Sequence, residues 1–114
     1  MDCIFCKIAN GEIPADVVYE DDAIIAFRDL APQAPVHVLI IPKTHIASFD
    51  DVDGSEEHIA LLGYLTSKIR DIAGLLGLET GYRVVNNCGE DAMQTVKHIH
   101  FHLLGGRKMS WPPG

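Results

Sequence analysis

Three of the chain's six histidines alternate along one short segment, where His98, His100 and His102 are separated by Ile99 and Phe101. On a β-strand, residues i, i+2 and i+4 share one face, so the three imidazoles should project together while the apolar residues point to the core. An imidazole can bind zinc, transfer a proton, or attack phosphorus and carry the transferred group. The spacing therefore predicts a reactive histidine strand and leaves metal catalysis and a histidine nucleophile as alternatives.

A polar loop over residues 88–95 leads into the histidine segment. Asn87, Gly89 and Thr95 would bring amide, backbone N–H and hydroxyl donors to its entrance. Such donors suit the binding of an oxyanion, although an ordinary surface loop has a similar composition. The loop therefore favours phosphate chemistry but does not decide the question alone.

Two cysteines near the start of the chain suggest a second site. Cys3 and Cys6 form a C-x-x-C pair, whereas Cys88 stands alone. A thioredoxin-like redox pair needs a preceding strand, and we expect none before residue 3. Two small thiols could also simply pack in the core. We favour a structural zinc site, because His45 and His98 offer the two further ligands that a pair of thiolates needs.

Hydrophobic periodicity predicts two helices that help to position these residues. A short helical turn covers residues 3–10 and stops at the Asn-Gly and Pro signals that follow. A long helix is predicted from Ser55 to Leu76, with Asp53 and Glu56 as a capping box and Gly77 as the stop. Its apolar stripe consists of Ile59, Leu62, Leu65, Ile69, Ile72, Ala73 and Leu76.

Apolar runs bounded by turn residues predict five short strands. The third run is apolar almost throughout and ends at Pro42, so we expect it inside a sheet rather than at a solvent-exposed edge. Five strands with one long helix inserted late predict an α+β fold, a five-stranded antiparallel sheet with the long helix on one face and a short N-terminal helix. The predicted strands cover residues 16–22, 23–29, 36–42, 81–87 and 97–105.

The chain has 114 residues and a formal net charge of −7. The length suits a single domain over residues 1–114. The charge argues against nucleic acid as the main partner, because such binding draws on clustered Lys and Arg. We find no stretch that resembles a signal peptide and no apolar run long enough to cross a bilayer, so we expect a cytoplasmic protein that does not bind membranes.

The motifs together resemble the histidine triad (HIT) superfamily. The likeness rests on "HIHFHLL", "CIFCKIANGEIPADVVYEDD", "AFRDLAPQAPVHVLIIPKTHI", "GYRVVNN" and the ending "LLGGRKMSWPPG". Within this superfamily, the sequence is similar to the Hint branch, the histidine triad nucleotide-binding proteins. His102 at the third triad position, in place of Gln, points to a hydrolase rather than a transferase.

The resemblance implies a purine nucleoside phosphoramidase that cleaves the P–N bond of adenosine or guanosine 5'-phosphoramidates. His100 would become nucleotidylated, and His102 would contact phosphate and help the leaving group, with no metal or other cofactor required for catalysis. The alternatives are a dinucleoside polyphosphate hydrolase, a nucleotide-binding interaction module with weak catalysis, and a zinc hydrolase that uses the triad as ligands.

The resemblance also implies the other site residues, a structural zinc and a homodimer whose sheet continues across the interface. The zinc ligands would be Cys3, Cys6, His45 and His98, which would leave His100 and His102 free for chemistry. The substrate contacts would be Asn87, Met93 and Thr95 for phosphate, Asp29 for ribose, Ile4, Phe5, Ile8, Phe27 and Leu30 for the purine base, and Trp111 near the C-terminus.

Two positions depart from the family pattern. Met93 stands where the family usually has a small residue, often Gly, so a backbone N–H bond to phosphate there requires Met to tolerate the local φ and ψ. Thr95 replaces Ser and adds a methyl group. Outside the motifs, we expect His37 to be a structural histidine on the third strand and His58 to face solvent on the long helix.

Overall fold

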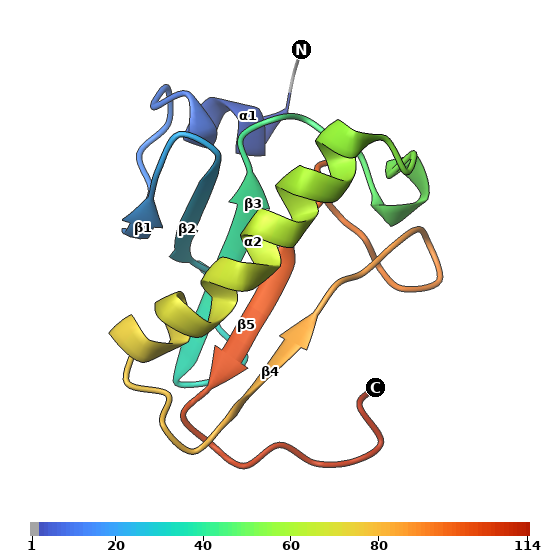
Figure 1. Ribbon diagram of the computed structural model, residues 1–114. Coiled ribbons are helices and arrows are strands. Elements are labelled where there is room, and N and C mark those ends of the chain that lie inside the picture. The colour runs from blue at the N-terminus through green and yellow to red at the C-terminus, as the bar shows by residue number, and fades with distance from the viewer. Residues whose placement is uncertain (1–2) are drawn as a thin grey trace.

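The computed structural model describes residues 3–114 and confirms the α+β architecture (Figure 1). All neighbouring strands are antiparallel, and their order across the sheet is β1-β2-β3-β5-β4. The third predicted strand is therefore central, as its apolar composition indicates. The elements are α1 (Ile4–Ala9), β1 (Val17–Glu20), β2 (Ile24–Arg28), β3 (Val36–Pro42), a 3₁₀ turn (Phe49–Asp51), α2 (Glu56–Leu75), β4 (Tyr82–Val85) and β5 (Phe101–Gly105).

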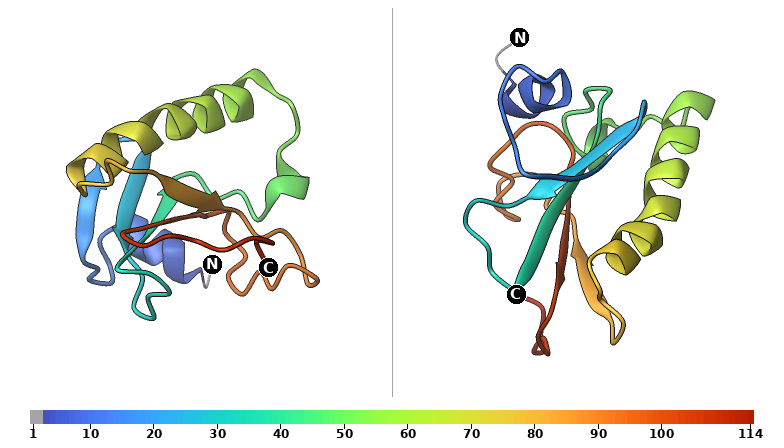
Figure 2. Two further views of the ribbon diagram at one scale, coloured as in Figure 1. Left: turned by 90° about the horizontal axis from the view of Figure 1, so that it is seen from below. Right: turned by 90° about the vertical axis from the view of Figure 1, so that its left-hand side faces the viewer.

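The sheet separates two layers of different size (Figure 2). The long helix α2 crosses one face of the sheet, and the short helix α1 lies against the other. β2 is buried on both sides: Ile24 and Ala26 pack in the layer of α2, whereas Ile25 and Phe27 pack in the layer of α1. This two-sided burial explains why β2 and β3 have continuous rather than alternating apolar runs. Within residues 3–114, none of the helices has the length and hydropathy of a membrane span.

The ends of α2 show which helix signals operate. Ser55 is the N-cap, since its Oγ accepts a hydrogen bond from the His58 N–H at 3.1 Å. The predicted capping box at Asp53 is wrong, because the Asp53 carboxylate accepts from the Ser55 N–H instead. The predicted stop is confirmed: Gly77 has a φ of +73°, and the Leu78 N–H closes the helix on the Ala73 carbonyl.

The buried side of α2 is shorter than its predicted stripe. Leu65, Ile69, Ile72 and Ala73 are buried against the sheet. Ile59 is 61 % exposed, so its inclusion in the stripe is wrong.

The reactive strand begins later than predicted. β5 starts at Phe101, so His98 and His100 lie in an irregular segment before it. The Ile99 N–H donates to the Ile46 carbonyl at 2.6 Å, which ties this segment to the loop after β3. The predicted alternation persists nevertheless, because Ile99, Phe101 and Leu103 are all buried in the layer of α2.

Candidate active site and metal centre

His100 is fixed by its own chain and by α1. Its Nδ1 lies 2.8 Å from the His98 carbonyl oxygen. A carbonyl oxygen only accepts, so we assign the hydrogen to Nδ1 and the unshared pair of the neutral ring to Nε2. Phe5 of α1 packs edge-on against the ring, with the centroids 5.1 Å apart. The side chain is buried, and these contacts give one nitrogen a defined orientation and a free lone pair.

His102 forms a chain of hydrogen bonds with a neighbouring strand. Its Nδ1 lies 2.8 Å from His37 Nε2, and His37 Nδ1 accepts from the Gln33 N–H at 3.0 Å. The backbone N–H must donate, so His37 carries its hydrogen on Nε2 and donates it to His102 Nδ1. In the neutral ring, His102 therefore carries its hydrogen on Nε2. This places a donor beside the lone pair of His100, whose ring centroid is 5.1 Å away.

Burial and neighbouring charges control the protonation of this pair. Burial, followed by the nearby imidazoles of His100 and His37, lowers the pKa of His102 to about 4, and the Asp29 carboxylate opposes the shift. Burial also lowers the pKa of His37, again against Asp29, whose carboxylate oxygen is 3.5 Å from His37 Nε2. Both rings are therefore neutral at pH 7 in the free protein. A bound anionic phosphate would favour a proton on the pair.

His37, which we expect to be a structural histidine, is hydrogen-bonded directly to the triad. His37 pairs with Leu104 and His102 with Leu39 in the β3–β5 register, so the two imidazoles are diagonal neighbours on one face. Adjacency of the third and fifth predicted strands would have revealed this contact. Asp29, His37 and His102 are also close enough to suggest a metal site. The hydrogen bond from Gln33 argues against it, because His37 Nε2 carries a hydrogen and has no lone pair for an ion.

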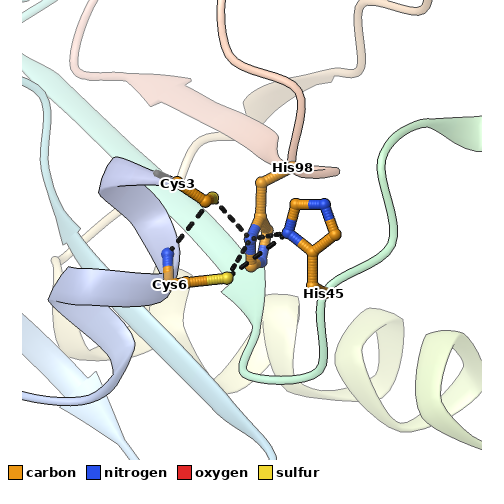
Figure 3. Close-up of side chains that lie close together, drawn as sticks. All are labelled: Cys3, Cys6, His45 and His98. Carbon is orange, nitrogen blue, oxygen red and sulfur yellow. Dashed lines mark hydrogen bonds between the residues drawn. The ribbon is translucent and has the colours of Figure 1, made fainter. Parts of the chain in front are cut away.

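The four predicted zinc ligands converge on one point (Figure 3). The four donor atoms, Cys3 Sγ, Cys6 Sγ, His45 Nδ1 and His98 Nδ1, all lie within 4.8 Å of one another. The two nitrogens are 3.2 Å apart, and each sulfur is 3.3 Å from one of them. A tetrahedral zinc site with ordinary bond lengths has edges of about 3.3 Å between nitrogens and about 3.6 Å between nitrogen and sulfur.

The orientation of His98 also fits a metal ligand. Its Nε2 lies 2.8 Å from the Pro42 carbonyl, so we assign the hydrogen to Nε2 and the lone pair to Nδ1, which faces the thiols. The ring is fully buried. The residues present therefore fit a divalent zinc ion, which when bound would cross-link α1, the loop after β3 and the segment before β5.

The residues expected to hold a purine base surround one cavity of about 250 Å³. Its walls are mainly apolar and come from α1, the following turn, β2 and β3. Asp29, the expected ribose ligand, lies at the same cavity. The expected residues that line it are Ile4, Phe5, Ile8, Phe27, Leu30 and Asp29.

The loop before β5 is held by two residues that sequence reasoning missed. Gln94 is buried, accepts from the Gly89 N–H and donates to two backbone carbonyls. Asn86 donates to the His100 carbonyl at 2.9 Å, which joins the end of β4 to the histidine segment. Both lie next to expected phosphate ligands in the sequence. An amide side chain in a polar loop is usually exposed, so little in the sequence indicated that these two hold the loop in place.

The remaining expected substrate contacts are less buried. Asn87 is half-buried, and Thr95 is exposed at the loop surface. Met93 has a φ of +59°, the left-handed region that favours glycine, and its N–H donates to the Glu90 carbonyl at 2.9 Å. That N–H is thus engaged within the loop rather than turned to a phosphate. Trp111 is exposed and does not line the cavity.

Known proteins share this sequence and architecture over almost their whole length. An uncharacterized HIT-like protein of Synechococcus elongatus is 57 % identical over 99 % of this chain and 97 % of its own. A 14 kDa zinc-binding protein of Zea mays is 54 % identical over 97 % of this chain and 87 % of its own. The crystal structure of a HIT family hydrolase from Legionella pneumophila superposes with a TM-score of 0.94 at 54 % identity, covering 99 % of this chain and all of that one. A sequence model of the HIT domain matches residues 10–109, and the chain belongs to the HIT domain family.

Proposed function

We propose that the protein is a Hint-type hydrolase that cleaves the P–N bond of adenosine or guanosine 5'-phosphoramidates. The observation that carries this proposal is the hydrogen bond between His100 Nδ1 and the His98 carbonyl oxygen. It leaves an unshared pair on Nε2 of a buried imidazole whose ring cannot turn freely. A nitrogen of this kind is suited to attack phosphorus and to carry the nucleotidyl group.

In the first step, His100 Nε2 forms a bond to phosphorus while the P–N bond breaks. The departing amine needs a proton to leave well. His102 Nε2–H lies next to the nucleophile and would donate to the phosphate or to the leaving nitrogen. The anionic substrate and Asp29 would favour a proton on His102 Nδ1, with the His37 Nε2–H turned instead to the Asp29 carboxylate oxygen 3.5 Å away. His102 protonated in this way is the proposed source of the proton.

In the second step, water attacks the nucleotidyl-histidine, the P–N bond to His100 breaks, and a nucleoside monophosphate leaves. The neutral His102 could accept the proton from this water and so return to its charged form. The apolar cavity beside α1 would hold the purine base, and Asp29 would bind the ribose hydroxyls. Asn87 and Thr95, at the loop before β5, would donate to the phosphate oxygens.

We further propose that the metal centre binds structural zinc. The convergence of two thiols and two imidazoles supports this assignment. The relatives of this chain from Zea mays and from Brassica juncea are both named 14 kDa zinc-binding protein. The metal would stabilise the fold by cross-linking the segments that carry its ligands, and it would not take part in either chemical step.

A homodimer is the proposed assembly, formed through the β4 edge of the sheet. Among the strands of residues 3–114, β4 pairs with β5 alone, and its Tyr82 and Val84 are exposed although their side of the sheet is the layer of α2. Antiparallel pairing of two such edges would continue the sheet and cover these side chains. Light scattering should give the mass of a dimer for the wild type and of a monomer for Val84→Lys.

The decisive test of the activity is intact-mass spectrometry after brief mixing with an adenosine phosphoramidate. The wild type should show a trapped AMP adduct, and His100→Ala should show none while its turnover falls about 10⁴-fold or more. The adduct should form equally in the presence of a chelator. AMP binding without turnover would favour an interaction module, and chelator-sensitive turnover without an adduct would favour metal-dependent hydrolysis.

A further inference from the structure

The metal centre and the proposed nucleophile share one residue. His98 turns its Nδ1 to the thiols, and its carbonyl oxygen accepts the hydrogen bond that fixes His100. A second connection passes through α1, where Phe5 lies between the two cysteines in sequence and packs against the rings of both His98 and His100. A change at the cysteine pair can therefore reach the nucleophile by two routes.

The two thiols have the arrangement of an oxidisable pair. Cys6 Sγ and Cys3 Sγ belong to the same convergent group of donors, and the Cys6 N–H donates to Cys3 Sγ at 3.3 Å. Both residues are free thiols. Cys6 is partly exposed, so a small oxidant can reach it. Metal-bound thiols are deprotonated, and the thiolate is the form that attacks a peroxide.

We propose that Cys3 and Cys6 are a reversible oxidation site, at which disulfide formation releases zinc and lowers nucleotide turnover. The effect on turnover rests on the proposed function, whereas the oxidation does not. Hydrogen peroxide is the oxidant. One thiolate attacks a peroxide oxygen, the O–O bond breaks, and a sulfenic acid and hydroxide form. The second thiolate then attacks that sulfur and displaces hydroxide. Two protons convert the hydroxides to water, so two thiolates and one peroxide give one disulfide and two waters.

The disulfide would alter α1, which is why the site affects the cavity. Cys3 is the N-cap of α1 and Cys6 lies in its first turn. A disulfide brings the two sulfur atoms to about 2 Å from each other, so oxidation would draw the N-cap and the first turn of α1 together. Ile4, Phe5 and Ile8 of this helix line the cavity proposed for the base. Oxidation thus moves one cavity wall and removes both sulfur ligands from the metal.

The test uses the zinc-loaded full chain with Cys88→Ala, which removes the one thiol outside the metal centre. After treatment with hydrogen peroxide, a chromogenic chelator should record one zinc released per chain, and the intact mass should fall by two hydrogens. Dithiothreitol with added zinc should reverse both changes. The kcat/KM for an adenosine phosphoramidate should fall about tenfold or more, because the nucleophile and the base are displaced together.

Two controls separate oxidation from general damage and from failure of the proposed activity. Cys6→Ser should bind less zinc and show no loss of two hydrogens after peroxide. If that variant does not fold, counting the thiols of the wild type that can be alkylated before and after peroxide measures disulfide formation instead. In proton NMR, the hydrogen-bonded Nδ1–H of His100, identified by its absence from His100→Ala, should shift on oxidation.

The outcomes are distinct. Zinc release without a disulfide, or a disulfide that leaves the His100 signal unchanged, would overturn the oxidation switch. A disulfide with zinc release and a shifted signal in a chain that never hydrolyses the phosphoramidate would support the oxidation site and overturn the proposed function.

Discussion

The layer beneath α2 and the layer beneath α1 are built on the same strands but differ in chemistry. The first is an apolar cluster drawn from α2 and all the central strands. The second is smaller and mixes apolar side chains with Cys3, and beside it lie the buried imidazoles of His98 and His100. Alternation along β2, β3 and the histidine segment sends each side chain to one layer or the other. The sheet thus separates the side chains that stabilise the fold from those that could do chemistry.

The comparison predicts that damage to the α2 layer reduces stability without disturbing the metal centre. Leu65→Ala removes a side chain with no exposed area and should lower the free energy of unfolding by about 3 kcal/mol. Zinc stoichiometry of the folded variant should stay at the wild-type value. Urea unfolding and metal analysis measure the two quantities. Ile59→Ala, on the exposed part of the same helix, is the matched control and should change stability by less than about 0.5 kcal/mol.

A substitution in the layer beneath α1 should have the opposite effect. Loss of His37 should lower activity and change stability little. His37→Asn removes the donor to His102 Nδ1 and should lower kcat/KM about 100-fold, the lower end of the range for acid–base groups. Urea unfolding of this variant should change far less than that of Leu65→Ala. His58→Asn provides a histidine control on α2 and should retain wild-type kcat/KM. Equal activity in the two variants would refute the role of the hydrogen-bonded pair.

Acid should weaken the fold through the same layer. The folded pKa of His102 is about 4, below its ordinary value of 6.5, chiefly because of burial and then the neighbouring imidazoles. Between these two values the unfolded chain binds a proton that the folded chain does not. The free energy of unfolding should therefore decrease as pH falls from 6.5 to about 4, and His102→Gln should reduce this decrease by about 1 kcal/mol. Both chains should be compared metal-free, and an unchanged pH dependence in the variant would contradict the prediction.

The smallest effect is expected at a contact that joins α2 to the β1–β2 turn. Asp21 accepts from the Tyr64 hydroxyl at 2.5 Å, from Tyr19, and from two backbone N–H groups of its own turn. Burial raises the pKa of Asp21, but these hydrogen bonds outweigh it and the net pKa is well below the usual range. Asp21→Asn should therefore lower the free energy of unfolding by about 1 kcal/mol at pH 7. The difference from wild type should shrink at acid pH, as the wild-type carboxylate is protonated.

The architecture was predictable because local signals and burial agree. Periodicity gave α2 its length, and Gly77 marked its end. The apolar run of β3 indicated a central strand. The start of β5 was predicted too early. Side chains alternate through His98 and His100 although this segment makes no strand pairing, and only tertiary contacts distinguish such an extended segment from a paired strand. Ser55 and Asp53 both suit an N-cap, and sequence does not show which one the chain geometry selects.

The site was predicted less evenly. The cysteine pair and its two histidines have a strong chemical pattern, and the structure brings all four together. His37, Gln94 and Asn86 have no such pattern, because their roles depend on which strand or loop lies beside them. The left-handed Met93 is a position where the residue type gives no warning, since only the backbone conformation reveals why glycine would suit it.

The two-sided burial of β3 limits how this chain can vary in length. Between Val36 and Pro42, successive side chains enter opposite layers, and one inserted residue would exchange them along the rest of the strand. His37 would then enter the hydrocarbon interior, and isoleucines would occupy the space of the imidazoles. We therefore expect natural insertions and deletions to be confined to the connecting loops. Any redesign of the protein should keep the seven-residue length of β3 unchanged.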